Sequence, residues 1–198
     1  MMSVVRLKRR YNLYYVSGIE NRKNMSKEDF ESQMKLVTHF DTIDEFWRTF
    51  LHLKLPSELQ LKSKLIVFKD KIDPLWEHPQ NKFGGSIYID FKVGEETDEA
   101  WQGLVLEFLT CFNNDPYFDN FINGIEVRRQ TIDSVSMILW TVDCETKDIK
   151  SLFGILKSYV PFPANTNYTF REHKRSINVG VHNKDNSQYP KQKYDNQF

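Results

Sequence analysis

Several features that this 198-residue sequence lacks narrow its class. No apolar run reaches the ~18 residues of a membrane-spanning helix, so no membrane partner is expected, and the N-terminus lacks the apolar core of a signal peptide. The two cysteines, Cys111 and Cys144, lack the paired spacing of a metal site, and we expect both to be reduced inside a cell. The 27 basic and 27 acidic side chains cancel, which argues against a protein that coats long nucleic acid.

Signatures of catalysis are also missing. The sequence contains no Walker loop, dinucleotide fingerprint, zinc-binding helix pair or serine elbow, and its five histidines are scattered. An acidic cluster over Glu95–Glu99 precedes or opens an expected helix, where negative charge stabilises the helix N-terminus without a metal. We therefore expect a binding protein rather than an enzyme, with no catalytic residue, cofactor or metal ion.

The composition that is present belongs to a folded domain. Apolar residues make up 40% of the chain and aromatic residues 14%, enough for a substantial core. We expect one domain over residues 1–182, followed by a polar, mobile tail over residues 183–198. A basic run near the N-terminus, Arg6 to Arg10, is equally compatible with a solvated edge and with a phosphate contact.

Periodicity predicts an α+β fold. The spacing of apolar side chains indicates three helices. The first begins after a capping box at Thr42 and Glu45, the second spans about Asp98–Phe112, and the third spans about Glu145–Tyr159. Seven strand-like runs are also expected: Tyr11–Ser17, Gln33–Phe40, Lys64–Lys69, Ser86–Lys92, Ile122–Arg129, Ser134–Val142 and Asn167–Glu172. Alternation in SIYIDF favours an antiparallel sheet with one packed face, which the helices would cover while the other face stays open for a ligand.

The segment DPLWEHPQNKFGG, residues 73–85, carries the strongest functional signal. It lies between two expected strands, and a loop of this kind has little packing duty, so a large aromatic such as Trp76 favours ligand binding. A Trp face can stack on a planar cation, and the carboxylate of the adjacent Glu77 can accept hydrogen bonds from the edge of that ligand. An alkylated, positively charged guanine fits this chemistry.

Three blocks of the sequence resemble the eukaryotic initiation factor 4E family, whose members hold the 5′ cap of messenger RNA. They are HFDTIDEFW (residues 39–47), FKDKIDPLWEHPQNKFGG (residues 68–85) and ILWTVDCE (residues 138–145), in the family's order and at fitting intervals. The resemblance implies a curved antiparallel sheet with three helices on its convex face and the cap on its concave face.

The same resemblance implies roles for individual residues. Phe30 and Trp76 would stack on the two sides of 7-methylguanine, Glu77 would bind the guanine edge, and Trp140 would contact the methyl group. Phe30 stands where the family has a Trp, so we expect weaker stacking, by about 1 kcal/mol. Phe30 could instead start a strand and pack in the core, Glu77 could be an ordinary solvated side chain, and Trp140 could be a buried strand residue.

The phosphate side departs from the family pattern. Arg128 matches a family arginine, whereas serines stand at two other cationic positions, Ser86 and Ser136. We expect Arg129 and Lys174 to assist Arg128 at the cap phosphates, with Lys82 and the neighbours of Lys174 as further candidates. Residues 173–175 could equally be a solvated strand end. Fewer phosphate contacts predict a shallower dependence of binding on salt.

A second surface is expected for a protein partner. Leu106 lies off the core stripe of its helix, and by resemblance Ile43, Trp47, Leu106 and Glu107 match positions at which the family docks a helical peptide. That peptide would belong to a scaffold factor of the 4G type or to a 4E-binding protein. The spacing of Trp47 also suits a core residue.

The resemblance implies a monomer in the cytoplasm, with the nucleus as a second compartment, that binds capped messenger RNA and recruits a scaffold to start translation. Two alternatives stay open: a divergent cap-binding repressor, and a protein-interaction module that has lost cap affinity. A cap hydrolase finds no candidate catalytic pair. Trp76 and Glu77 argue against the interaction module, whereas Phe30 and Ser136 indicate divergence.

Overall fold

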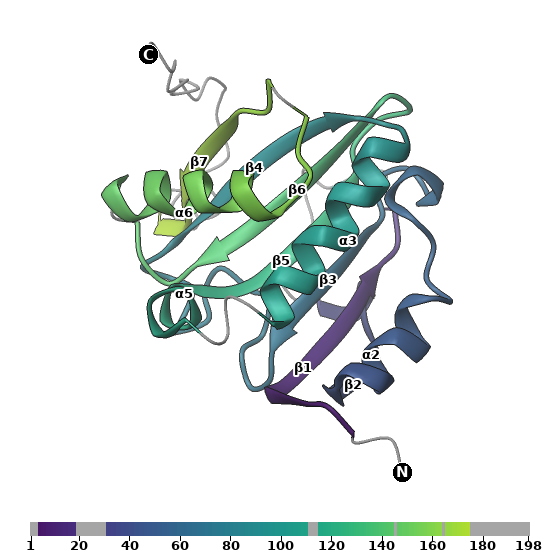
Figure 1. The fold of residues 1–198 in the computed structure, drawn as a ribbon, viewed down its shortest axis with the longest axis horizontal. Helices are drawn as coiled ribbons and strands as arrows, with labels where there is room; N and C mark the ends of the chain where they lie inside the picture. Colours follow the sequence, from purple (N-terminus) through teal and green to yellow (C-terminus); the bar gives the residue numbers. More distant parts are fainter. Residues whose placement is uncertain (1–3, 19–30, 111–114, 145, 164, 175–198) are drawn as a thin grey trace.

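A single antiparallel sheet organises the chain (Figure 1). The computed structural model describes residues 4–18, 31–110, 115–144, 146–163 and 165–174. Within them the strands are β1 (Arg6–Val16), β2 (Met34–Thr42), β3 (Lys64–Lys69), β4 (Gly85–Lys92), β5 (Ile122–Arg129), β6 (Ser134–Thr141) and β7 (Tyr168–Glu172). Every pairing is antiparallel, in the order β2-β1-β3-β5-β6-β4-β7. The predicted antiparallel α+β fold is confirmed.

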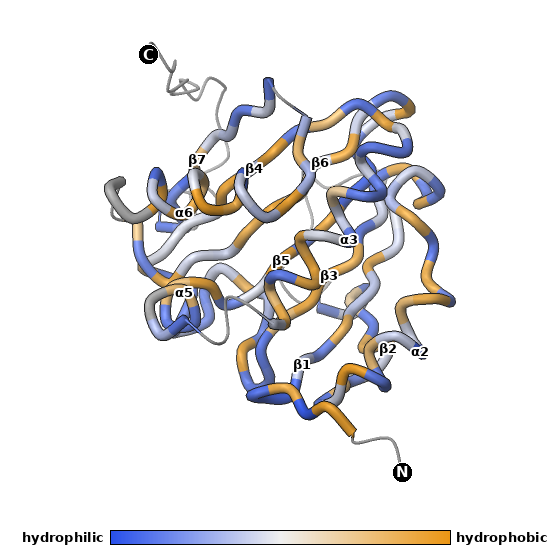
Figure 2. The backbone as a smooth tube through the Cα atoms, viewed as in Figure 1, coloured by the Kyte–Doolittle hydropathy of each residue, from blue (hydrophilic) through white to orange (hydrophobic). Residues whose placement is uncertain are grey.

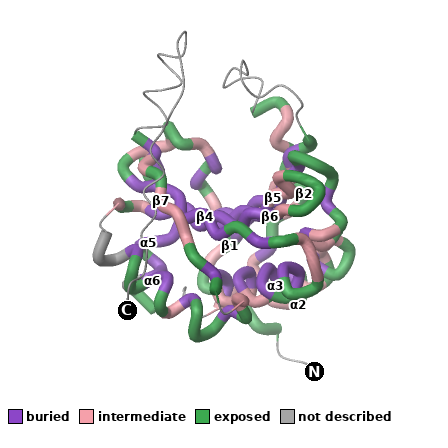
Figure 3. Tube along the Cα trace, turned by 90° about the horizontal axis from the view of Figure 1, so that it is seen from above, coloured by how far each residue is buried: buried purple, intermediate pink, exposed green. Residues whose placement is uncertain are grey.

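Three helices cover one face of the sheet. They are α2 (Ile43–Phe50), α3 (Glu95–Leu109) and α6 (Thr146–Tyr159), and Figure 3 shows them on the same side. We call this side the convex face and the opposite side the concave face. Two short elements, η2 (Pro56–Glu58) and α5 (Pro116–Phe121), were not predicted, because they are too short to show a helical stripe.

The start of α2 follows the predicted capping chemistry with one change. The Thr42 hydroxyl accepts a hydrogen bond from the Glu45 amide at 3.2 Å, which satisfies one of the free amides of the first turn. The Glu45 carboxylate accepts from the amide of Asp41 at 3.0 Å, one residue before the cap, rather than from Thr42 itself. The cap places α2 directly after the edge strand β2.

Apolar side chains form two clusters, one on each face of the sheet. The larger cluster fills the space between the strands and the three helices and includes Tyr11, Phe40, Trp101 and Phe108. The smaller cluster lies on the concave face. Figure 2 shows the central strands largely in hydrophobic colours and the turns that connect them largely in hydrophilic ones. The concave face is therefore partly apolar rather than wholly open, and a ligand there would rest on packed side chains.

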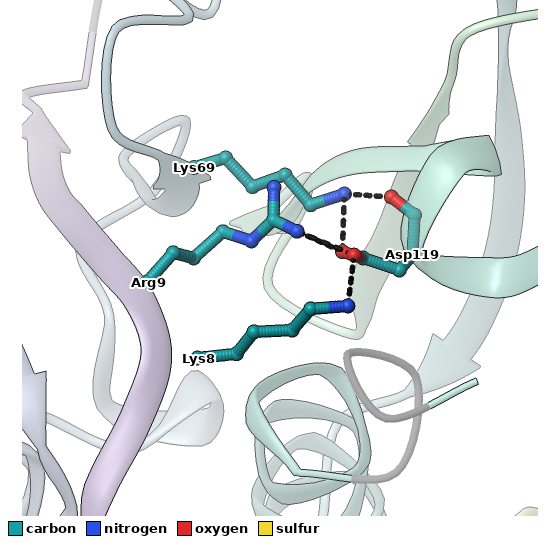
Figure 4. A network of polar contacts seen from close by, with 4 residues as sticks. All are labelled: Lys8, Arg9, Lys69 and Asp119. Atoms are coloured by element: carbon teal, nitrogen blue, oxygen red, sulfur yellow. Dashed lines mark hydrogen bonds and ion pairs between the residues drawn. The ribbon is translucent and has the colours of Figure 1, made fainter. Parts of the chain in front are cut away.

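The basic run at the N-terminus has a structural role that the sequence did not indicate. Lys8 and Arg9 of β1 and Lys69 of β3 all contact the buried carboxylate of Asp119 in α5 (Figure 4). The Lys8 and Lys69 ammonium groups lie 2.7 and 3.2 Å from Asp119, and Lys69 also donates to the Asp119 carbonyl. These contacts attach α5 to strands β1 and β3.

Burial and charge act in opposite directions on the two groups at the centre of this cluster. Burial lowers the pKa of Lys69 to about 8, although the Asp119 carboxylate works against that shift. Burial alone would raise the pKa of Asp119, but the hydrogen bond from Lys8 and the charge of Lys69 bring it below its ordinary value. Asp119 is thus a shared counter-charge for Lys8, Arg9 and Lys69.

Some expectations concern residues outside the described part of the chain. The predicted tail over residues 183–198 and Cys111 both lie there. Cys144 is described and does not form a disulfide. Among the helices in the described ranges, none is both long enough and apolar enough to cross a membrane.

Replacing Asp119 tests the importance of this ionic cluster. We expect Asp119→Asn to lower the free energy of unfolding by roughly 3 kcal/mol, because the buried Lys69 charge loses its counter-charge. Urea denaturation measures the change, with Asp133→Asn in an exposed turn as the control, which should shift stability by less than about 0.5 kcal/mol. Adding Lys69→Met to Asp119→Asn should recover part of the loss. An Asp119→Asn variant as stable as the control would contradict this account.

Candidate functional site

The loop between β3 and β4 presents the aromatic and acidic pair expected from the sequence. The Trp76 side chain is 40% exposed, and Glu77 beside it is exposed as well. Within the described part of the chain, no aromatic ring stacks on Trp76, and no residue forms an ion pair or hydrogen bond with the Glu77 side chain. Both side chains are therefore available to a ligand. Phe30, the expected second stacking ring, lies outside the described residues.

Hydrogen bonds of the buried Asn81 side chain fix the conformation of this loop. Asn81 is completely buried, and its side-chain amide donates to the carbonyl oxygens of Asp73 and Leu75, both at 2.9 Å. Its side-chain oxygen accepts from the Asn123 amide at 2.9 Å, which links the loop to β5. Buried polar groups that are satisfied in this way fix the backbone, so the loop is preorganised around Trp76.

The two glycines that end the loop fit a tight backbone contact. At Gly84, an added Cβ would come within 1.8 Å of the Thr141 carbonyl oxygen on β6, a distance that no side chain tolerates. Gly84 also donates its amide to the Asn81 carbonyl at 3.0 Å and accepts from the His173 amide at 3.0 Å. The absent side chain lets the loop lie against both β6 and the end of β7.

His173 connects β7 to the loop and is not part of a solvated strand end. It is 1% exposed, and its Nδ1 lies 2.7 Å from the Asn81 carbonyl oxygen while its Nε2 lies 2.8 Å from the Ser86 hydroxyl. A carbonyl only accepts, so Nδ1 carries the hydrogen and Nε2 accepts from Ser86. Burial lowers the pKa of His173, although the hydrogen bond to Asn81 opposes that shift. The lowered pKa keeps the ring neutral at physiological pH.

Trp140 on β6 is buried in the concave cluster. It is 4% exposed, and its ring centroid lies 5.3 Å from that of Phe68 and 4.9 Å from that of His173. Its indole Nε1 finds no hydrogen-bond partner among the described residues. The side chain therefore packs as a buried strand residue next to His173, and its contact with a methyl group of the ligand stays a prediction.

Cationic side chains on the concave face gather around Tyr88 of β4. The guanidinium carbons of Arg128 on β5 and Arg171 on β7 lie 5.2 and 4.6 Å from its ring centroid. A third cation on this face, Lys64, is buried and forms an ion pair with Glu126 at 3.3 Å, so its charge is already compensated. Burial raises the pKa of the Tyr88 hydroxyl, although the nearby arginines oppose that shift.

The structure does not bring Arg129 to this face. Successive side chains of a strand point to opposite sides, so Arg129 points away from Arg128. Its guanidinium donates to the backbone carbonyls of Ser57 at 2.6 Å and Thr131 at 2.9 Å, and to that of Ile132 as well. These bonds pin the β5–β6 turn to η2, and we correct the expectation that Arg129 assists at the cap phosphates.

Lys174 is exposed and lies over the Phe83 ring, with its ammonium 4.9 Å from the centroid.

The four residues expected to contact a protein partner lie on two helices of the convex face. Ile43 and Trp47 of α2 and Leu106 and Glu107 of α3 are all partly exposed. Trp47 and Leu106 also pack against the main core, which explains why the spacing of Trp47 is ambiguous. One carboxylate oxygen of Glu107 is buried and has no hydrogen-bond partner among the described residues. An unsatisfied acceptor of this kind favours an incoming donor.

Sequence reasoning missed Asn81 and Arg171, and it considered His173 only as a phosphate contact or part of a solvated strand end, not as the buried link that it is. Asn81 and His173 act through hydrogen bonds between segments distant in the chain, which no local pattern reports. Arg171 could have been found, because alternation along YTFRE places it on the same face as His173. Within the described ranges, no group of three or more His, Cys, Asp or Glu side chains could hold a metal ion.

Acidification tests the buried state of His173. Because the folded ring has a lowered pKa, the unfolded chain takes up a proton first, so the stability that the neutral ring contributes is lost as pH falls below the ordinary value of about 6.5. We expect the wild type to lose more stability between pH 7.5 and 5.5 than His173→Gln, measured by urea denaturation. The exposed His52→Gln should keep the wild-type dependence. Equal losses for all three proteins would show that His173 is not held neutral.

Comparison with known proteins gives one consistent result. A sequence profile of the family described as "Eukaryotic initiation factor 4E" matches residues 6–188. Eukaryotic translation initiation factor 4E of Homo sapiens is 27% identical over 158 residues, which cover 76% of this chain and 70% of the human protein.

Solved structures agree with the sequence match. eIF4E-3 of C. elegans, in complex with the 4E-binding protein Mextli and a cap analog, has a TM-score of 0.76 and 25% identity, and the match covers 89% of this chain and 96% of that one. Ascaris suum eIF4E-3 with an m7G cap has a TM-score of 0.71 and 25% identity, over 86% and 92% of the two chains. With this fold and a profile match over nearly its whole length, the chain belongs to the eukaryotic initiation factor 4E family.

Proposed function

We propose that this protein binds the 7-methylguanosine cap of messenger RNA on its concave side and recruits a scaffold protein to start translation. The observation that carries the proposal is the exposed Trp76 beside an exposed Glu77, on a loop fixed to the sheet by Asn81 and His173. A cap analog and an m7G cap bound to structural relatives support it.

The chemistry of the pair suits a methylated guanine. Methylation at N7 makes the base cationic, so its attraction to the electron-rich Trp76 face exceeds that of plain guanine. The Glu77 carboxylate accepts hydrogen bonds from the guanine edge in a charge-assisted geometry, whereas adenine lacks the matching donors. Phe30 is proposed as the second stacking ring and Trp140 as the residue beneath the methyl group. The proposed phosphate contacts are Arg128 and, at the rim, Lys174.

The convex face is proposed to take a helical peptide of a scaffold factor of the 4G type or of a 4E-binding protein. Trp47 and Leu106 offer apolar surface, and the Glu107 oxygen that has no partner among the described residues could accept a hydrogen bond from the peptide. The Mextli complex of C. elegans eIF4E-3 supports a partner of this kind.

The protein is proposed to act without catalysis, as a monomer, in the cytoplasm and also in the nucleus. A divergent cap-binding repressor is the second candidate, favoured by the serines at positions 86 and 136. A module that has lost cap affinity is the third, and the exposed pair of Trp76 and Glu77 argues against it.

Two substitutions test the cap site. We expect Trp76→Ala to weaken binding of 7-methyl-GTP by at least about tenfold, because base stacking contributes on the order of 1–3 kcal/mol. Glu77→Gln should cost about 2 kcal/mol and reduce the preference for 7-methyl-GTP over 7-methyl-ATP. Isothermal titration calorimetry measures both changes.

The matched controls for this test are Trp47→Ala on the convex face and Glu99→Gln on the exposed side of α3, which should bind 7-methyl-GTP as the wild type does. A wild type that does not prefer 7-methyl-GTP over GTP would refute the proposed function. Wild-type affinity in Trp76→Ala would refute the stacking role.

Leu106→Ser tests the convex face separately. A labelled helical peptide that contains a Tyr and a downstream Leu should bind the wild type, and the variant should bind it roughly tenfold more weakly, because a central apolar contact is lost. Fluorescence anisotropy measures the affinity, and retention on 7-methyl-GTP resin should not change. Gln102→Ala, on the exposed side of α3, is the control. Unchanged peptide affinity in Leu106→Ser would exclude this face as the docking site.

A further inference from the structure

Two arginines from different strands converge on one tyrosine ring of the concave face. Tyr88 lies at the centre of β4, and its ring has the Arg128 guanidinium carbon 5.2 Å and the Arg171 guanidinium carbon 4.6 Å from its centroid. Arg128 belongs to β5 and Arg171 to the edge strand β7. Because β5 and β7 lie on opposite sides of β4 in the sheet, the two positive charges reach the Tyr88 ring from two directions.

No carboxylate compensates this pair within the described part of the chain. Neither guanidinium forms a salt bridge there, and the nearest acidic groups of the face are already engaged. Glu126, on the same strand and face as Arg128, is paired with Lys64 at 3.3 Å. The Asp90 carboxylate accepts a hydrogen bond from the Ser136 hydroxyl. The ring faces of aromatic residues attract cations, but they carry no net charge and do not neutralise the two guanidinium groups.

The pair adjoins the proposed base site. Arg171 stands directly opposite Ser86 in the β4–β7 register, and the Ser86 hydroxyl bonds to His173, which holds the Trp76 loop. Ser86 is short and completely covered, so the longer Arg171 side chain can extend past it and over Tyr88. An anionic group attached to a base held by Trp76 would therefore lie next to these arginines.

We propose that Arg171, together with Arg128, binds the polyphosphate of a capped ligand, with the Tyr88 ring holding both guanidinium groups on the concave face. This inference rests on the proposed function and deepens it, because it assigns a phosphate contact to β7. Guanidinium groups present several N–H donors in a planar fork that matches phosphate oxygens, and a phosphate chain would supply the negative charge that the pair lacks. Arg171 is then a specificity residue for the number of phosphates.

A phosphate series separates this role from simple packing on Tyr88. The affinities of 7-methylguanosine and of its mono-, di- and triphosphates are measured by titration calorimetry for the wild type, Arg171→Gln, Arg171→Lys and Arg48→Gln. We expect Arg171→Gln to bind the triphosphate roughly tenfold more weakly and to lower the salt slope of that binding by about one, with the nucleoside affinity unchanged. Arg171→Lys should recover part of the loss, and Arg48→Gln, an exposed arginine of α2, should match the wild type.

The possible failures are distinguishable. If Arg171→Gln gains as much affinity from each added phosphate as the wild type, Arg171 only covers Tyr88 and the inference is wrong while cap binding stands. If Arg171→Gln weakens the nucleoside and the triphosphate equally, it acts through the β7 structure, which also overturns the inference. A wild type that binds no methylated ligand removes the proposed function, and the inference with it.

Discussion

The hydrogen bond between the His173 ring and the Asn81 carbonyl is the contact on which the concave site depends. It joins the last strand of the sheet to a loop that lies some ninety residues earlier in the chain, and the same ring packs against Trp140. Asn81 in turn fixes the backbone around Trp76 through two carbonyl oxygens. Without this bond the aromatic and acidic pair would sit on an ordinary long loop, whose ordering by a ligand would cost conformational entropy.

Because side chains alternate along each strand, the two faces of the sheet have different roles. Successive residues of β5 show this division: Val127 packs under the helices, Arg128 reaches Tyr88 on the concave side, and Arg129 donates to the Ser57 carbonyl of η2. One strand thus supplies core, ligand surface and turn anchoring in consecutive positions. The convex helices remain free to meet a protein while the concave face holds a small ligand.

What could be predicted from the sequence is what local periodicity encodes. The alternation in Ser86–Lys92 and the stripe of α3 gave the sheet and its packed face, and β3 and β5 have their predicted bounds. The exposed Trp76 also followed from its place in a polar loop. The partners of His173, Asp119 and Arg171 could not be predicted, because each comes from another strand or helix and its identity depends on register. Arg129 was misplaced for the same reason, since neighbouring residues of a strand face opposite ways.

The position of β7 has a thermodynamic consequence. It is a strand of five residues that ends the sheet and, within the described residues, pairs with β4 alone, and elements with few contacts are the first to open in native-state fluctuations. Because His173 and Arg171 stand on or directly after this strand, its detachment would release the loop and separate the arginines in one event. Occupancy of the site and the order of the sheet edge are therefore linked by mass action, so a bound ligand would stabilise the state in which β7 is attached to β4.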